Sequence, residues 1–142
     1  MKSKLIILFS LCIFYSCRVL LVPEYSQALE KQITAGQKLN DQFYLDLQMM
    51  DQKDRTFESC KKKYVEIESE INSIMFQNKS RKKNDDMIAI VKTLKDKFVQ
   101  YKTEHKTKTT LSDGEIKIYE EDIAALWLPL LVAEKALKKA KK

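Results

Sequence analysis

Hydrophobic residues recur at alternating intervals of three and four positions along most of this chain, which is the spacing of one face of an α-helix. The pattern is most regular over residues 57–74 and 116–137, clear over 87–101 and less regular over 29–50. The positions that form the four stripes are Leu29, Ile33, Gly36, Asn40, Phe43, Leu47 and Met50; Phe57, Cys60, Tyr64, Ile67, Ile71 and Ile74; Met87, Val91, Leu94, Phe98 and Tyr101; and Ile116, Tyr119, Ile123, Leu126, Leu130, Ala133 and Leu137.

Turn and capping residues predict where these helices begin and end. Pro23 suits the first turn of a helix, so the first helix is expected to run from about Pro23 to Gln52. Asp54 or Thr56 begins the second helix, and the polar stretch 78–84 separates it from the third.

The last helix has the most clearly marked start. After the Lys- and Thr-rich stretch 106–111, Ser112 and Glu115 have the spacing of a capping box, in which each side chain bonds the backbone N–H of the other residue. Four helices with short connections pack naturally as an up-down-up-down bundle. The chain is therefore predicted to be all-α, a four-helix up-down-up-down bundle behind an N-terminal signal segment.

Pro129 interrupts the stripe of the last helix. A proline inside a helix leaves the carbonyl of the residue four positions earlier, here Ala125, without its partner and bends the helix. One interpretation is a bend that wraps the helix around the core. The other is that Trp127, Leu128 and Pro129 form an exposed surface for a binding partner.

Composition agrees with a helical chain. Gly and Pro occur twice each and charged residues make up 32 % of the sequence, whereas Gly and Pro usually account for about 7 % and 5 % of residues. Residues 23–142 are enough for a single helical-bundle domain with a modest core.

The first residues have the pattern of an export signal. Two lysines precede an apolar run over residues 5–15, which is too short to cross a hydrocarbon core of about 30 Å as a helix. Residues 14–17 resemble a bacterial lipobox, in which a small residue precedes the cysteine that is acylated. Residues 1–16 are therefore expected to be a lipoprotein-type signal peptide, Cys17 the lipidated anchor carrying palmitate or a similar chain, and residues 17–22 a short tether.

Two other outcomes remain open at the N-terminus. The apolar residues 19–22 extend the run past Arg18, so residues 5–22 can also serve as an uncleaved anchor. Cleavage without acylation would give a secreted protein. The first two outcomes fasten the protein to a membrane of the bacterial cell envelope, facing the periplasm, and the choice between inner and outer membrane stays open.

Cysteine content favours an anchor over a disulfide framework. Cys12 would leave with the signal, so only Cys17 and Cys60 remain. If Cys17 is acylated, Cys60 is an unpaired thiol, which an oxidising compartment tolerates when the thiol is buried. If Cys17 is free, a disulfide between Cys17 and Cys60 is the other possibility.

Candidate catalytic groups are few. His105, the single histidine, lies near the end of the third helix, where the helix dipole favours it, and Lys102 stands where a Glu-x-x-His metal motif needs a carboxylate. Cys60 lies on a core stripe, where burial raises the pKa of a thiol and makes it inert. No catalytic residue, metal site or cofactor is therefore expected, and a thiol-dependent protein using Cys60 is the reactive alternative.

Positive charge gathers at the C-terminus. The formal net charge of +6 falls to +4 once Lys2 and Lys4 leave with the signal. Nucleic acid is not expected as a partner, because the chain is exported and because Lys far outnumbers Arg, the better reader of bases and phosphates. Tail lysines complement the dipole at the end of the last helix, and an even number of helices also places them beside the anchor, where they can contact anionic headgroups. These lysines are Lys135, Lys138, Lys139, Lys141 and Lys142.

The layout combines a short signal, Cys17, the sequence Pro23-Glu24-Tyr25 and a late histidine in the third helix. It resembles small uncharacterised bacterial helical-bundle lipoproteins over most of the chain. The resemblance implies an envelope-localised helical bundle and no particular activity.

The sequence thus predicts a membrane-tethered envelope lipoprotein that acts as a helical binding module without catalysis. A periplasmic carrier of lipid or a small apolar ligand is an alternative, because aromatic side chains on the stripes could line a cavity between the helices. Sequence patterns leave the protein partner, the pathway and the oligomeric state open, since such stripes serve intramolecular bundles and coiled-coil dimers equally well.

Overall fold

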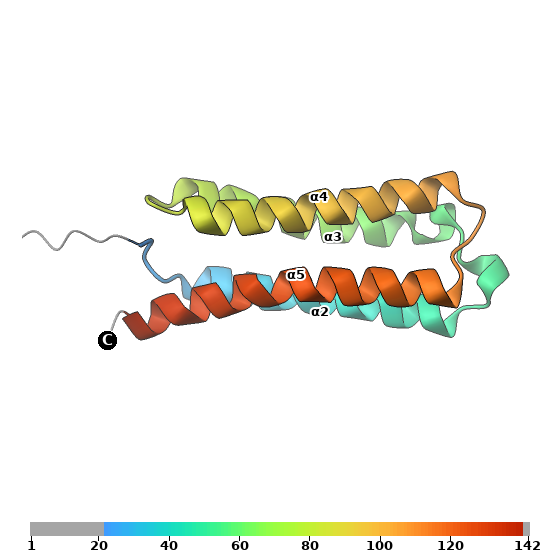
Figure 1. The fold of residues 1–142 in the computed structure, drawn as a ribbon, viewed down its shortest axis with the longest axis horizontal. Coiled ribbons are helices and arrows are strands. Elements are labelled where there is room, and N and C mark those ends of the chain that lie inside the picture. Colours follow the sequence, from blue (N-terminus) through green and yellow to red (C-terminus); the bar gives the residue numbers. More distant parts are fainter. Residues whose placement is uncertain (1–21, 141–142) are drawn as a thin grey trace, which may run out of the picture.

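The computed structural model describes residues 22–140. Within this range the chain forms four α-helices, α2 (Gln27–Met49), α3 (Phe57–Ser80), α4 (Asp85–Thr107) and α5 (Asp113–Ala140), with one 3-10 turn, η2 (Gln52–Asp54), between α2 and α3 (Figure 1). The described residues contain no strand. The predicted signal peptide, residues 1–16, and the predicted anchor Cys17 lie outside the described range.

Each helix packs against two others. α2 contacts α3 and α5, and α4 contacts the same two helices, so the order around the bundle follows the order along the chain. Consecutive helices run in opposite directions, and the start of the described chain and the end of α5 lie at the same end of the bundle (Figure 1). The predicted up-down-up-down bundle is confirmed.

Two ends of the bundle are distinguished below. The termini end consists of residues 22–26, the α3–α4 connection 81–84 and the last residues of α5, 134–140. The loop end consists of the α2–α3 connection 50–56 and the α4–α5 connection 108–112.

Side-chain caps fix where the helices begin. The Oγ of Ser26 accepts a hydrogen bond from the backbone N–H of Leu29 at 3.2 Å, so α2 starts later than the position predicted from Pro23. The expected start was too early because proline only tolerates a first turn, whereas the cap satisfies one of its free N–H groups. Thr56 caps α3 in the same way, which confirms the second of the two predicted starts.

The capping box at the start of α5 is confirmed. The backbone N–H of Ser112 donates to Glu115 Oε2 at 2.9 Å, and the backbone N–H of Glu115 donates to Ser112 Oγ at 3.4 Å. The ammonium group of Lys108, together with the hydrogen bonds from Ser112, lowers the pKa of Glu115 to about 2. This carboxylate therefore stays charged across the physiological range and holds the first turn of α5.

The stripes of α3 and α4 form the core as predicted. The predicted positions on α4 from Met87 to Tyr101 are buried, and so are those on α3 from Cys60 to Ile74, while Phe57 is partly buried. Aromatic side chains fill the middle of the core, where the Tyr64 ring lies 4.9 Å from that of Phe43 and 5.8 Å from that of Phe98, measured between centroids.

The stripe of α5 differs from the prediction. Trp127 and Glu134 are fully buried, while Leu126 and Ala133, the residues before them, are only partly buried. The reason lies on α2, where Gly36 leaves room for the indole: a Cβ on Gly36 would lie 2.6 Å from Cη2 of Trp127. Helices α2 and α5 therefore approach closely at Gly36, and the buried positions Trp127 and Glu134 each lie one residue after the predicted Leu126 and Ala133.

Candidate functional site

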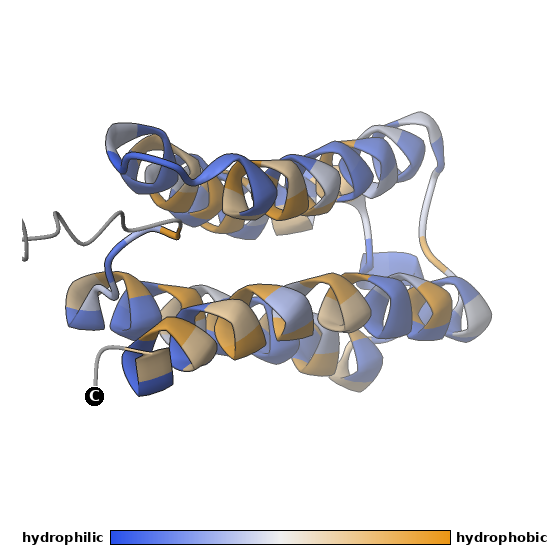
Figure 2. Ribbon diagram, turned by 60° about the vertical axis from the view of Figure 1, so that its left-hand side comes forward, coloured by the Kyte–Doolittle hydropathy of each residue, from blue (hydrophilic) through white to orange (hydrophobic). Residues whose placement is uncertain are grey.

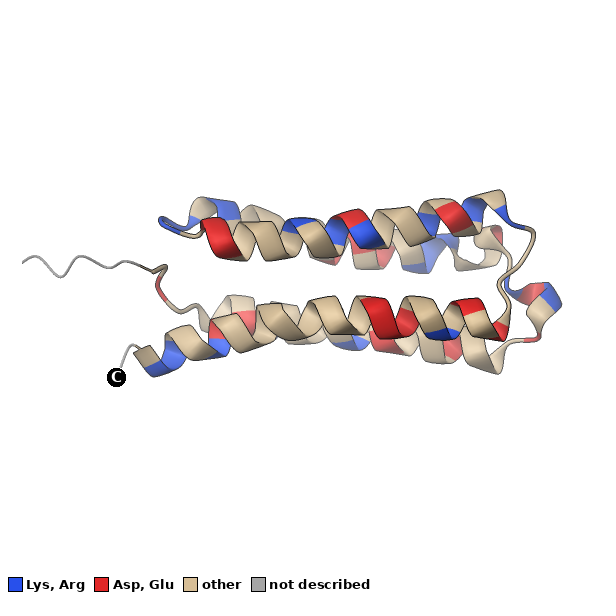
Figure 3. Ribbon diagram, in the orientation of Figure 1, with Lys and Arg blue, Asp and Glu red and all other residues tan. Residues whose placement is uncertain are grey.

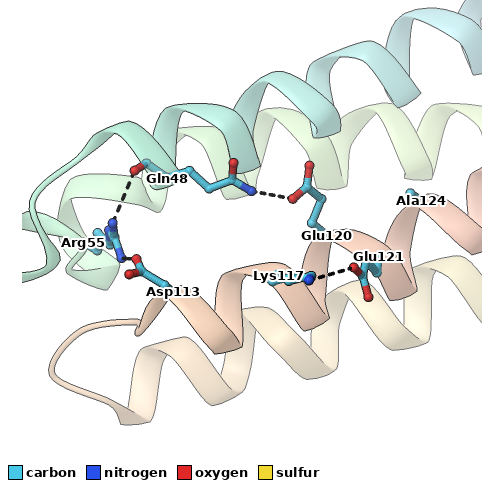
Figure 4. Close-up of a pocket in the computed structure, with 7 residues that line it drawn as sticks. All are labelled: Gln48, Arg55, Asp113, Lys117, Glu120, Glu121 and Ala124. Atoms are coloured by element: carbon cyan, nitrogen blue, oxygen red, sulfur yellow. Dashed lines mark hydrogen bonds and ion pairs between the residues drawn. The ribbon is translucent and has the colours of Figure 1, made fainter.

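A groove lies at the loop end, between the end of α2 and the start of α5 (Figure 4). It has a volume of about 750 Å³, and its walls carry charges of both signs. Across it Gln48 Nε2 donates to Glu120 at 2.5 Å, while Lys117 and Glu121 lie 4.0 Å apart on one helix face. The lining residues are Gln48, Arg55, Asp113, Lys117, Glu120, Glu121 and Ala124.

Arg55 closes one end of this groove and joins three segments. Its Nε donates to the carbonyl of Met50 at 2.9 Å and its Nη1 to the carboxylate of Asp113 at 2.5 Å. The guanidinium is buried while the Asp113 side chain is 89 % exposed. The guanidinium of Arg55 already bonds to groups within the chain. It therefore stabilises the loop end and offers no unpaired positive charge to a ligand in the groove. The sequence offered no signal for the contact with Asp113, which lies 58 positions away at the start of α5.

His105 lies inside the loop end and is fully buried. Its Nε2 donates to the backbone carbonyl of Arg55 at 3.0 Å, and the hydroxyl of Tyr64 donates to its Nδ1 at 2.9 Å. This assignment follows from the carbonyl, which can only accept. Burial lowers the pKa of the imidazole, so the neutral form is the stable one. His105 lies near the end of α4 as expected, but as a neutral group that joins α4 to α3 and to the α2–α3 connection, not as a charge on the helix dipole.

Cys60 is a buried, free thiol near this cluster. Burial raises its pKa, only partly offset by the neighbouring Ser59 hydroxyl, which lies 3.6 Å from the sulfur. A thiol with a raised pKa is a poor nucleophile at neutral pH. The predicted core position of Cys60 is confirmed.

The termini end contains a buried ion pair that the sequence did not reveal. Glu134 is fully buried on α5, and its carboxylate accepts from Nη1 of Arg81 at 2.7 Å and from the backbone N–H of Ser26 at 2.7 Å. Arg81 also donates to the carbonyl of Glu24. One ion pair therefore joins the α3–α4 connection, the last turns of α5 and the segment through which the chain enters the bundle.

The predicted lysine cluster lies at the termini end. Lys135, Lys138 and Lys139 are exposed there, where Figure 3 shows blue bands near the C-terminus, whereas Lys141 and Lys142 lie outside the described residues. Lys138 Nζ lies 3.5 Å from Glu30 and 5.4 Å from the centre of the Tyr25 ring. These contacts with Tyr25 and Glu30 raise the pKa of Lys138. Lys138 therefore holds the end of α5 against Tyr25 and the first turn of α2.

The predicted partner surface is only partly exposed. Trp127 faces the core against Gly36, so the expectation that it would be exposed is wrong. Leu128 is 58 % exposed, and Pro129 is exposed as well. The helix continues through Pro129 to Ala140. The prediction failed because hydrophobic spacing alone placed Leu126 on the core face, whereas the size of Trp127 and the space above Gly36 decided the rotation.

Between residues 22 and 140 no group of three or more His, Cys, Asp or Glu side chains is arranged to hold a metal ion. No helix in that same range is both long and apolar enough to traverse a bilayer.

No family model, curated protein or solved structure matches this chain.

Proposed function

We propose that this protein is a membrane-tethered lipoprotein of the bacterial envelope whose helical bundle acts as a binding module, without catalysis. The observation that carries the proposal is that the first and the last described residues lie at the same end of the bundle (Figure 1). The backbone N–H of Ser26 is bonded to Glu134 near the end of α5, so the chain enters the bundle beside its own C-terminal lysines. An acyl chain on Cys17 would bring this end to the bilayer.

The charge at the termini end supports the same arrangement. Lys135 and Lys139 on α5 and Lys82 in the α3–α4 connection are exposed at this end. A lysine close to an anionic membrane contributes about 1 kcal/mol of attraction. A buried acyl chain contributes about 0.8 kcal/mol per methylene, so a multiply acylated Cys17 would hold the domain stably on the membrane. The lysines would add to this attraction.

The other polar groups of the bundle support binding over catalysis. Arg55, Arg81 and His105 each bond to groups within the chain. A catalytic acid or base needs to reach a substrate atom within hydrogen-bond distance. These three side chains brace the connections between helices.

The two alternative functions find less support. A carrier needs an internal space, and the aromatic side chains that could line it, among them Phe43, Tyr64 and Phe98, pack directly on one another. A thiol-dependent reaction needs an accessible thiolate, and Cys60 is 4 % exposed with a raised pKa.

Metabolic labelling with radioactive fatty acid tests the tether. We expect label in the wild type and in Cys12→Ala, because Cys12 would be removed with the signal peptide, and no label in Cys17→Ala. Equal labelling of all three proteins would overturn the lipoprotein assignment. Intact mass measurement separates the remaining outcomes, because an uncleaved anchor keeps Met1 and a secreted form lacks both the leader and the acyl mass.

A further inference from the structure

The outward side of α5 is apolar over about three turns. Leu128 and Val132 are 58 % and 56 % exposed. Ala125, Pro129 and Ala136 are exposed at spacings of three and four residues from them, so all five lie on one side of the helix. This surface, called here the outer α5 face, consists of Ala125, Leu128, Pro129, Val132 and Ala136.

In this half of α5 a charged residue is buried and apolar residues are exposed, the reverse of the usual arrangement. From Ile123 to Ala133 the sequence has no charged residue, and the next carboxylate, Glu134, points into the core. The corresponding stretch of ribbon is tan in Figure 3 and carries orange bands in Figure 2. A surface helix normally turns its charges outward. Here the buried pair with Arg81 takes the charge inward and leaves an apolar surface outside.

The exposed apolar residues of α3 do not form such a surface. On α3, Val65 and Phe76 are 60 % and 75 % exposed, but the polar residues Ser69 and Asn72 separate them on the same side of the helix. Single exposed apolar residues are normal on soluble proteins. The continuity of the outer α5 face is what distinguishes it.

Lysines continue the outer α5 face towards the termini end. Lys135 and Lys139 follow Leu128 and Val132 at helical spacing and are exposed. A helix that carries apolar side chains beside lysines lies in the interface of an anionic membrane, with its apolar side in the headgroup and acyl boundary. Both the lysines and the apolar residues of this side of α5 are therefore suited to contact with an anionic membrane.

The size of the face argues against a protein partner. It offers five side chains on one helix, whereas a stable protein interface uses roughly 20–30 residues on each side. A bilayer needs no matching surface, and its contact adds to that of a tether. The chain is also long enough to reach the bilayer, because the nine residue-to-residue steps from Cys17 to Ser26 can extend to about 32 Å.

We propose that the outer α5 face docks on the anionic surface of the membrane to which Cys17 is tethered, so that the bundle lies with α5 against the bilayer. This inference rests on the proposed tether, and it adds the orientation of the bundle and the lipid chemistry. Lys135 and Lys139 contact anionic headgroups, and Leu128, Pro129 and Val132 enter the interface.

Photocrosslinking of the full-length native protein tests the docking. The protein is placed on vesicles that contain a photoactivatable phosphatidylglycerol, and crosslinked peptides are mapped by mass spectrometry. We expect crosslinks over residues 123–139 and few around Val65 and Phe76. The variant Leu128→Gln/Val132→Gln should lose most α5 crosslinks. The matched variant Val65→Gln/Phe76→Gln should keep them. Replacing Lys135 or Lys139 with Gln should lower the α5 crosslink yield by up to about fivefold for each lysine.

Each result decides the proposal. Equal crosslinking of α3 and α5, crosslinks confined to the residues before Val22, or no association with the vesicles would overturn docking. Capture of α5 by another protein in place of lipid would overturn it as well. Fatty-acid labelling of the same preparation separates the two claims: labelled protein without α5 crosslinks removes the docking alone, and unlabelled protein with α5 crosslinks removes the tether alone.

Discussion

The two ends of the bundle are each braced by one arginine, but the surroundings of the two ion pairs differ. At the termini end Arg81 and Glu134 are both shielded, with 14 % and 0 % of their side chains exposed. At the loop end Arg55 is 6 % exposed while Asp113 is 89 % exposed. An isolated charge in the interior is costly, whereas a charge left at the surface is hydrated. The contribution of Arg81 to stability therefore depends on its partner Glu134, whereas that of Arg55 depends little on Asp113.

The neighbours of the two arginines extend this difference. Arg81 and Glu134 hold the chain entry through the carbonyl of Glu24 and the N–H of Ser26, so breaking the pair should loosen the segment that leads to the predicted tether. Arg55 supports its own connection through the carbonyl of Met50, and its own carbonyl receives His105. The loop end therefore has a second buried side chain, His105, that bonds to the same connection as Arg55.

The largest effect is expected from Arg81→Met. This change leaves Glu134 buried without a cation, and we expect a loss of about 3–5 kcal/mol in the free energy of unfolding, measured by urea denaturation. The double variant Arg81→Met/Glu134→Leu should recover much of this loss, because it removes the stranded carboxylate. A single variant as stable as the wild type would show that the pair does not brace the termini end.

Arg55→Met should cost less. It removes the hydrogen bonds to backbone carbonyls but leaves Asp113 in water, and we expect a loss of about 1.5–3 kcal/mol by the same measurement. The control Asp113→Asn should cost no more than about 1 kcal/mol, because Asp113 is exposed and Arg55 keeps its hydrogen bonds to the carbonyls of Met50 and Gln48. If Asp113→Asn were as damaging as Glu134→Gln, the contrast between the two ends would be wrong.

Acid should weaken the loop end through His105. Because burial lowers the pKa of His105 in the folded chain, the unfolded chain binds a proton first as the pH falls. The contribution of neutral His105 is therefore complete above the unfolded pKa of about 6.5 and is lost as the pH falls towards the lower, folded pKa. The slope is at most one proton, or about 1.4 kcal/mol per pH unit.

Stability measured from pH 7.5 to about 5.5 separates this effect from that of Glu30, Glu104 and Glu115, whose pKa values are lowered in the folded chain and which affect stability mainly from their ordinary pKa of 4.5 downwards. His105→Gln should flatten the profile. A slope that persists in His105→Gln would assign the acid sensitivity to another group.

The smallest effect is expected in the α3–α4 connection. Lys83 has a φ of 55°, in the left-handed region that favours glycine. Lys83→Gly should raise the free energy of unfolding by about 0.5 kcal/mol, after allowing for the greater freedom of glycine in the unfolded chain. The neighbouring Lys82→Gly, at a position without positive φ, should lower it slightly. Thermal denaturation of both variants compares the two signs directly.

Local signals predicted much of this architecture. The stripes of α3 and α4, the cap at Thr56 and the capping box of Ser112 with Glu115 depend on residues three or four positions apart, and short-range geometry fixes such contacts. The late start of α2 also had a local signal, because Ser26 is a good capping residue that follows Pro23.

The remaining features depend on contacts between segments far apart in the chain. Glu134 interrupts an apolar pattern as an isolated charge, and only the folded bundle brings Arg81 to it across 53 positions. His105 likewise meets Tyr64 and the carbonyl of Arg55 only when α3, α4 and the α2–α3 connection come together. The sequence by itself determined that there would be helices, which residues most of them bury and where most of them begin, because these depend on local spacing and capping. The tertiary structure decided the rotation of α5, through the fit of Trp127 over Gly36, and so decided which side of α5 remains apolar and exposed.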